Sequence, residues 1–444
     1  MTRGVAVFEK LRQVRRNARE RVDLTRLIDD CRQLLTVKGE GNSVALAAQA
    51  LDRYERLGND GAQQFFELLA QEFDPDPGEV LQLAERYAVS RSPENLVKLS
   101  KAAEPPRQEL LRRLNRAPGG TGVIVRMRAA LLDRLRHDKK LVAVDADFEH
   151  LLSSWFNPGF LSLVQVDWRS PAMLLERLIQ HEAVHEIDGW GDLRRRLEPD
   201  RRCFAFFHPV LPDEPLIFVE VALLAQMPEA IAPLLDRSAP PATVDPGKFR
   251  VAAFYSISNC QPGLRGVNLG NFLIKRVAEK LQQEFPAIRT FCTLSPVPSF
   301  ATWLARVERL ESERLKPVQT RDLAATLAGL RERHPRDLSA LHSAQQPTDD
   351  VEALKQLLAF YLVCRSALPG GESAAGTDPV ARFHLNNGAR LERVNVAADL
   401  SRKGLKQSFG FMVNYLYDLD EIEANHEKYM SGEVSASRAV LGLI

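Results

Sequence analysis

The string HEAVH at residues 181–185 is the first place in this sequence where residue types and their spacing suggest a chemistry. It matches H-E-x-x-H, in which two histidines one helical turn apart bind zinc and the glutamate acts as a general base. A helix expected over residues 171–185 would place His181 and His185 on one face. However, Leu174 and Leu178 continue the same stripe, and an apolar stripe indicates packing against a core.

Residues beyond this string do not complete an extended zinc motif. Such a motif would have glycine at 188 and histidine at 191, where this sequence has Asp188 and Gly191. A distant acid such as Glu214 or Glu220 would still be available as a third ligand, so a zinc site stays open as an alternative. We expect no metal site.

A second candidate site is the stretch FYSISNCQPGLRGVNLGNFLIKRVAEKLQQEFP, which begins at Phe254. It predicts a strand, then a turn containing Gly263, Gly266 and Gly270, and then an amphipathic helix that ends at Pro286. A glycine-rich turn before a helix directs backbone N–H groups at a phosphate. The spacing fits neither the Walker motif nor G-x-G-x-x-G. A strand-to-helix turn without a ligand therefore stays open.

Composition limits the class of protein. The chain has 444 residues, enough for two or three domains, and its net charge of +1 favours neither nucleic acid nor an anionic membrane as a partner. Its five cysteines form no C-x-x-C pair, so we expect neither a disulfide framework nor a cysteine zinc site.

The sequence also predicts where in the cell the protein is found. We find no apolar run near the roughly 20 residues of a membrane span. The arginine-rich residues 1–24 lack the pattern of a signal peptide. We expect a cytoplasmic protein.

The elements that must hold these residues differ between the two halves of the chain. Residues from about 22 to 140 read as successive amphipathic helices separated by proline or glycine. From about 155 onward, strands alternate with helices, and a helical block over about 302–366 interrupts them. The expected strands are 161–168, 203–210, 215–224, 250–258, 289–297, 391–399 and 410–419. Besides the helix at 171–185, helices are expected at 191–197 and 271–285.

The glycine-rich loop and the order of elements around it resemble the GNAT acetyltransferase superfamily, which holds the pyrophosphate of coenzyme A at such a turn. Longer strings resemble the malonyl-CoA decarboxylase family, namely TLSPVPSF at 293–300, DPVARFHLNNGARL at 378–391 and KQSFGFMVNYLY at 406–417. The resemblance implies an all-α N-terminal helical bundle over 1–155. It also implies an α/β GNAT-like domain over 156–444, a mixed sheet flanked by helices with an insertion at 302–366.

The resemblance also implies the site residues. Ser295 is expected as proton acceptor and His384 as proton donor, with Ser256 and Tyr417 at further active-site positions. The segment expected to bind malonyl-CoA is Arg265, Gly266, Val267, Asn268, Leu269, Gly270 and Asn271. Asn268 stands where animal members of the family carry a glutamate, which puts in doubt any mechanism that needs a carboxylate there.

The activity implied is conversion of malonyl-CoA to acetyl-CoA and CO2, in fatty acid metabolism. The thioester accepts the electron pair, so no cofactor is expected. Ser256 and Ser295 lie at the ends of two strands that part in a GNAT-like sheet, which would place both hydroxyls beside the thioester. A homo-oligomer, a tetramer in the family, is implied as well. A GNAT-type acyltransferase and a non-catalytic acyl-CoA-binding scaffold stay open as alternatives.

Overall fold

The computed structural model describes residues 20–36, 42–237, 246–267, 269, 273–312, 314–365 and 377–444. By packing, the chain forms two compact units. The first comprises Met1–Ser162, Phe207–Leu216 and Gln261–Leu269, and the second comprises Leu163–Phe206, Ile217–Cys260 and Gly270–Ile444. The division into domains at 1–155 and 156–444 stays a prediction.

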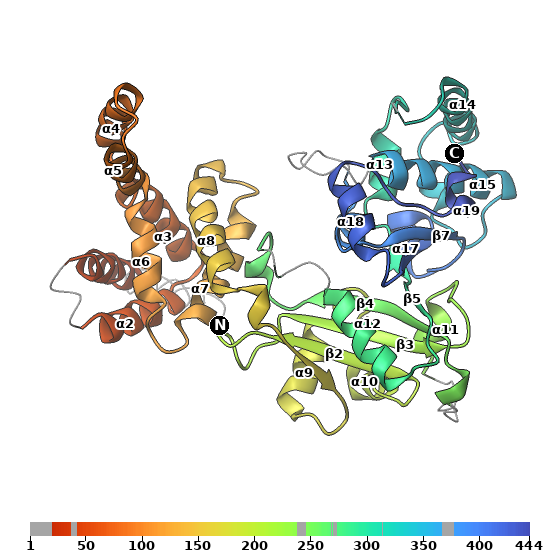
Figure 1. The fold of residues 1–444 in the computed structure, drawn as a ribbon, viewed down its shortest axis with the longest axis horizontal. Helices are drawn as coiled ribbons and strands as arrows, with labels where there is room; N and C mark the ends of the chain where they lie inside the picture. Colours follow the sequence, from red (N-terminus) through yellow and green to blue (C-terminus); the bar gives the residue numbers. More distant parts are fainter. Residues whose placement is uncertain are drawn as a thin grey trace, which may run out of the picture. The chain divides into compact units, whose positions relative to one another are not determined.

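The first unit is built from helices, coloured red to yellow in Figure 1. A helix over 20–34 precedes α2 (Ser43–Glu55), α3 (Asn59–Glu72), α4 (Pro77–Val89), α5 (Pro93–Ala103), α6 (Pro106–Leu114), α7 (Gly120–Arg134) and α8 (Val142–Trp155). Asp76 and Ser92 cap α4 and α5 by accepting from free backbone N–H groups, and a proline follows each cap. Fully buried side chains such as Phe66, Leu110 and Phe148 form the core. Local signals in the sequence therefore determine these helix starts.

The second unit contains a mixed sheet in the order β1-β2-β3-β4-β5-β8-β6, with β7 also paired to β8. Strands β2, β3 and β4 are antiparallel, β4 and β5 are parallel, and β8 runs antiparallel to β5, β6 and β7. The strands are β1 (Ser162–Val166), β2 (Arg201–Phe207), β3 (Ile217–Leu224), β4 (Val251–Asn259), β5 (Thr290–Thr293), β6 (Ser295–Pro296), β7 (Arg390–Asn395) and β8 (Met412–Tyr417).

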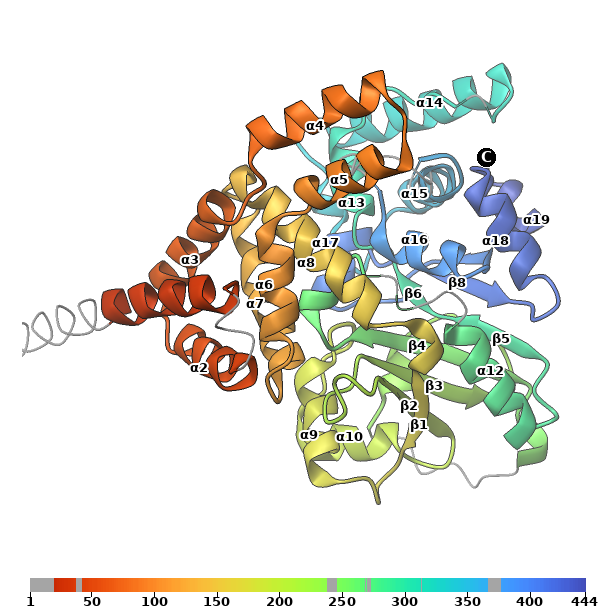
Figure 2. The same cartoon turned by 60° about the vertical axis from the view of Figure 1, so that its left-hand side comes forward.

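Helices cover both faces of this sheet. Arg202 of β2 hydrogen-bonds Glu284 of α12 (Leu273–Glu284), whereas Glu220, opposite the next β2 residue, pairs with Arg196 of α10 (Gly189–Arg196). Successive strand residues face opposite sides, so α12 and α10 lie on opposite faces. The remaining helices are α9 (Ala172–His181), α11 (Ala232–Leu235), α13 (Phe300–Arg306), α14 (Pro317–Arg333), α15 (Thr348–Phe360), α16 (Pro379–Asn386), α17 (Arg402–Ser408), α18 (Ile422–Met430) and α19 (Arg438–Leu441), many of them labelled in Figure 2.

The expected fold class is confirmed: a helical N-terminal region is followed by a mixed sheet with flanking helices. Each expected strand is present, but the one expected over 289–297 is broken at Leu294 into β5 and β6. Among the described residues, no helix is both long enough and apolar enough to cross a membrane.

The break opens the sheet. Strands β4 and β5 pair from Val251 to Phe254, and the last bond between them runs from the Leu294 N–H to the Phe254 carbonyl at 3.0 Å. Beyond it, β4 continues beside β3, while the chain after Leu294 pairs with β8. Ser256 and Ser295, each two residues past the last parallel pair, therefore stand on opposite sides of the opening.

A buried side chain from β8 stabilises the broken strand. The Asn414 Nδ2 donates to the Thr293 carbonyl at 2.7 Å and to the Pro228 carbonyl at 3.1 Å. Its Oδ1 accepts from Asn395 at 2.7 Å and from Arg393 at 3.0 Å. Asn414 is 0% exposed, so these bonds satisfy polar groups that have no access to water.

We expect Asn414→Ala to lower the free energy of unfolding by about 2–4 kcal/mol, because it leaves several buried polar groups without partners. Urea unfolding measures the change. Asn59→Ala, at the exposed start of α3, is the control and should change stability by less than about 0.5 kcal/mol. Equal effects of the two substitutions would contradict the role given to Asn414.

Candidate active site

Ser295 and His384 lie in hydrogen-bond contact although 89 residues separate them in the sequence. The Ser295 Oγ lies 3.0 Å from the His384 Nε2, and each residue is only 4% exposed. Ser295 follows directly on the break between β5 and β6, and His384 comes from α16. The break in the strand positions Ser295, and helix α16 positions His384 beside it.

The contact belongs to a longer chain of neutral groups. The Tyr417 hydroxyl, at the end of β8, lies 2.8 Å from the His384 Nδ1, and the Ser295 Oγ donates to the Thr293 Oγ1 at 2.8 Å. Tyr415 stacks on the imidazole with ring centroids 4.7 Å apart. Both ring nitrogens are therefore occupied, and the ring plane is held by an aromatic neighbour.

One buried carboxylate joins the two segments that carry this pair. Asp378 caps α16 by accepting from the N–H groups of Val380 and Ala381, both at 3.0 Å. It also accepts, at 3.1 Å, from the backbone N–H of Ser299, which lies four residues after Ser295. The sequence analysis missed Asp378. An acid directly before a proline at a helix start would have been the signal.

Burial controls the charge of the site. It lowers the pKa of His384 to about 3 and raises the pKa of Tyr417 well above its usual value. In this environment the imidazole is neutral near pH 7 and both of its partners are hydroxyls. The pKa of about 6.5 that an unperturbed histidine has therefore does not hold for the free site.

Ser256 has a different set of partners. Its Oγ donates to both carboxylate oxygens of Glu182 at 2.7 Å, and Ser258 donates to the same carboxylate at 3.0 Å. Glu182 belongs to the HEAVH string, and the sequence analysis did not connect it with Ser256. No local pattern links two residues 74 positions apart.

The zinc interpretation fails on geometry. It required a helix through His185, but α9 ends at His181 and Glu182 has an extended backbone. The two histidines therefore do not share a helical face. Glu220, the distant ligand left open, is paired with Arg196 at 2.9 Å. Among the residues with described positions, no group of three or more His, Cys, Asp or Glu side chains is arranged to hold a metal ion.

The segment expected to bind coenzyme A is described in part, and its described part lies in the first unit. Arg128 of α7 donates to the carbonyls of Gly263 at 3.1 Å and Arg265 at 2.6 Å. A Cβ on Gly263 would lie 1.9 Å from a backbone oxygen of α7, and Gly266 has φ +85°, so both positions need glycine. Val267 and Leu269 are buried. Asn268, Gly270 and Asn271 fall outside the described residues.

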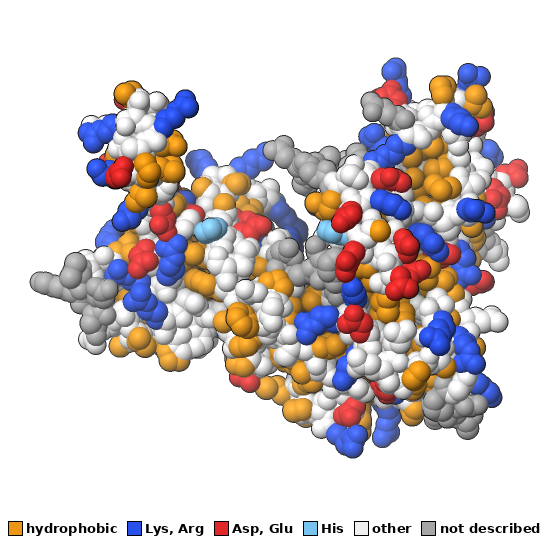
Figure 3. Space-filling model, in the orientation of Figure 1, with side chains coloured by type: hydrophobic (Ala, Val, Ile, Leu, Met, Phe, Trp, Pro, Cys, Tyr) orange, Lys and Arg blue, Asp and Glu red, His pale blue; other side chains and the backbone are white. Residues whose placement is uncertain are grey.

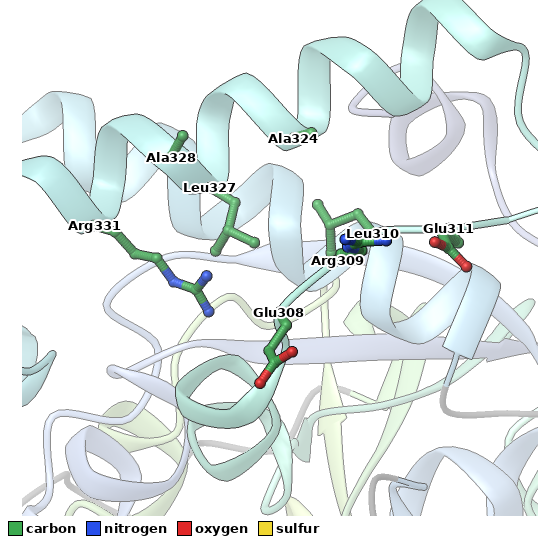
Figure 4. A pocket seen from close by; sticks show the side chains of 8 residues that line it. All are labelled: Glu308, Arg309, Leu310, Glu311, Ala324, Leu327, Ala328 and Arg331. Carbon is green, nitrogen blue, oxygen red and sulfur yellow. The ribbon is translucent and has the colours of Figure 1, made fainter.

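The surface carries mixed charge and a hollow that lies apart from the expected site residues in the sequence. Figure 3 shows basic and acidic side chains interspersed on the face in view, in keeping with the net charge of +1. Figure 4 shows a hollow of about 290 Å³ between α14 and the chain around Leu310. Arg309 and Arg331 line it, and none of the expected site residues does.

The neutral His384 predicts a pH effect on stability. The unfolded chain binds a proton at this residue below about pH 6.5, whereas the folded chain does so only near pH 3, so stability falls as the pH drops through that window. Between pH 7.5 and 5.5, His384→Gln should lose about 1.4 kcal/mol less than the unsubstituted protein. Urea unfolding at both pH values tests this. The exposed control His137→Gln should keep the original pH dependence, and an identical loss in the His384 variant would contradict a neutral buried ring.

Comparison with known proteins supplies the family. The sequence model of the malonyl-CoA decarboxylase C-terminal domain matches residues 159–444, and that of the N-terminal domain matches residues 73–156. The mitochondrial malonyl-CoA decarboxylase of Mus musculus is 35% identical over 424 residues, which cover 89% of this chain and 82% of the mouse protein.

Solved structures agree with the sequence matches. The crystal structure of malonyl-CoA decarboxylase from Rhodopseudomonas palustris has a TM-score of 0.81 and 45% identity, and the match covers 94% of this chain and 98% of that one. The corresponding structure from Agrobacterium vitis has a TM-score of 0.77 and 46% identity, with 94% and 99% covered.

The comparisons also correct one expectation. The relatives from Mus musculus, Anser anser anser and Rattus norvegicus are all described as mitochondrial, which contradicts the cytoplasmic location expected from the sequence. Because the C-terminal match alone spans more than half of the sequence, and the mouse relative is similar over most of its length, the chain belongs to the malonyl-CoA decarboxylase family.

Proposed function

We propose that this chain is a carboxy-lyase that converts malonyl-CoA to acetyl-CoA and CO2. The observation that carries the proposal is the buried chain of Tyr417, His384 and Ser295 at the opening of the sheet, in a member of the malonyl-CoA decarboxylase family. A thioester enolate needs a hydrogen-bond donor at its oxygen and a proton at its carbon. This group of side chains has both.

The chemistry balances with one proton taken up in each turnover. The bond between the carboxylate carbon and carbon 2 breaks, CO2 leaves, and the electron pair moves into the thioester to give an enolate. Carbon 2 then takes a proton and the carbonyl re-forms. Because the thioester itself accepts the electron pair, we propose that neither a metal nor an organic cofactor takes part.

The electrostatics of the pair suit this sequence of steps. In the free site, burial keeps His384 neutral. A substrate carboxylate beside the ring favours the imidazolium, because an opposite charge stabilises the charged form. The proton then lies between Nε2 and the Ser295 Oγ, in reach of carbon 2, while Tyr417 holds Nδ1. We assign His384 as the donor and Ser295 as the group that accepts and passes on its proton.

The test is a steady-state assay with malonyl-CoA and no other acceptor. We expect the unsubstituted protein to release acetyl-CoA, and Ser295→Ala and His384→Ala each to lower turnover by at least about 10²-fold. Ser153→Ala and His137→Ala, both at exposed positions, serve as matched controls. Full activity in the His384 variant would remove it from the mechanism. A requirement for an acyl acceptor would favour an acyltransferase instead.

We propose that residues 265–271 bind the pyrophosphate of coenzyme A, as the glycine-rich turn suggests. Arg128 is 1% exposed and holds the start of this turn through two carbonyls. A turn released from α7 would lose its preformed shape and bind the anion less tightly. The homo-oligomer implied by the family stays a proposal as well.

Arg128→Gln should therefore raise KM for malonyl-CoA about 10-fold and change turnover much less, since the hydrogen bonds of Arg128 go to the glycine-rich turn and to Asp145 and Glu149, not to the side chains proposed for the chemical step. Arg126→Gln is the control on the same helix, because Arg126 is exposed and pairs with Glu55. Steady-state kinetics of both variants measure KM and turnover, and circular dichroism verifies that both variants fold. A lower turnover at unchanged KM would contradict the binding role.

A further inference from the structure

Glu182, the acid of the HEAVH string, is the buried group that the proposed reaction leaves without a task. Glu182 is 9% exposed as a residue, and its carboxylate lies among four donors. The N–H groups of Val184 and His185 donate to it at 2.8 Å, and the hydroxyls of Ser256 and Ser258 donate at 2.7 and 3.0 Å. Four donors around two oxygens suit an ionised carboxylate, which can only accept.

This arrangement determines the direction of the Ser256 hydroxyl. A serine has one proton, and that proton points to Glu182, so the Ser256 Oγ has only lone pairs left for any further partner. Ser256 stands at the β4 side of the sheet opening, level with Ser295 on the other side. The two sides therefore differ: one offers an acceptor backed by a negative charge, and the other offers a neutral serine, imidazole and tyrosine chain.

The surroundings hold this orientation. Ser258 accepts from the Ala183 N–H at 3.1 Å, and Lys403 donates to the carbonyls of Ala183 and Val184 at 3.1 and 3.2 Å. The neighbouring acid Glu220 is paired with Arg196. The segment that carries Glu182 is thus joined to the end of β4 by Ser256 and Ser258, and to α17 by Lys403.

We propose that Glu182 is a positioning residue of the decarboxylation site, which orients Ser256 to accept a hydrogen bond from the amide N–H nearest the sulfur of the thioester substrate. The inference rests on the proposed function. The malonyl group has only acceptors, namely its carboxylate, its carbonyl and the sulfur. The nearest donor in coenzyme A is the amide separated from the sulfur by an ethylene group. A negative charge behind Ser256 also disfavours the enolate oxygen on that side and directs it toward Ser295 and His384.

The test compares two small substrates that differ in this amide. The malonyl thioester of N-acetylcysteamine carries the N–H, and the malonyl thioester of butanethiol lacks it. We expect the unsubstituted protein to favour the first by about 3- to 10-fold in kcat/KM, the range of one neutral hydrogen bond. Ser256→Ala should abolish this preference. Glu182→Gln should reduce it strongly, because the amide of glutamine can donate to the same Ser256 lone pair.

Ser153→Ala, at an exposed serine, is the control and should keep the preference. A preference that survives in Glu182→Gln would remove Glu182 from the role. A loss in Ser256→Ala that is equal for both thioesters would show that Ser256 acts at the reacting atoms instead. If Ser256→Ala fails to fold by circular dichroism, Ser256→Cys keeps the side-chain volume and replaces it. Failure of the proposed function is a separate result, namely no acetyl-CoA from malonyl-CoA with the unsubstituted protein.

Discussion

The parting of β4 and β5 after Phe254 and Thr293 is the constraint on which the rest of the site depends. A continuous parallel pair would use its backbone groups within the sheet and leave no room for a ligand between the strands. Once the strands part, the buried carbonyl of Thr293 needs another partner, and the side-chain amide of Asn414 provides it. Ser256 then keeps its pairing with β3 and Ser295 its pairing with β8, but the two serines have no ladder partner across the opening. The strand can break here because a side chain supplies a hydrogen bond in place of those between β4 and β5.

The two sides of the opening are electrostatically unlike. On the β5 and β6 side, His384 binds only hydroxyls, and burial keeps the group neutral until a charged ligand arrives. On the β4 side, the carboxylate of Glu182 accepts hydrogen bonds from four donors. A decarboxylation moves negative charge from a carboxylate to a thioester oxygen, so such a difference favours one direction of charge movement. In the mechanism proposed above, these groups are in place before the reaction begins, so little solvent has to reorganise.

Buried polar side chains do most of the positioning. Asp378 joins the helix of His384 to the turn after Ser295, Asn414 supports the broken strand, and Arg128 holds the glycine-rich turn in the first unit. Each has several partners, so each restricts more than one segment. The proposed mechanism gives none of the three a chemical step. In each case, the satisfaction of backbone groups that water cannot reach specifies the geometry.

The sequence by itself determined seven strand regions, most of the helices around them and the strings that identify the family, because hydrophobic period, capping residues and turn residues act over a few neighbours. Only the tertiary structure decided where a strand breaks, that the helix of the HEAVH string ends at His181, and how Glu182 meets Ser256. The same is true of the depressed pKa of His384, which depends on burial by distant segments. These features arise from contacts between residues far apart in the chain, and no local pattern records which distant partner will satisfy a polar group.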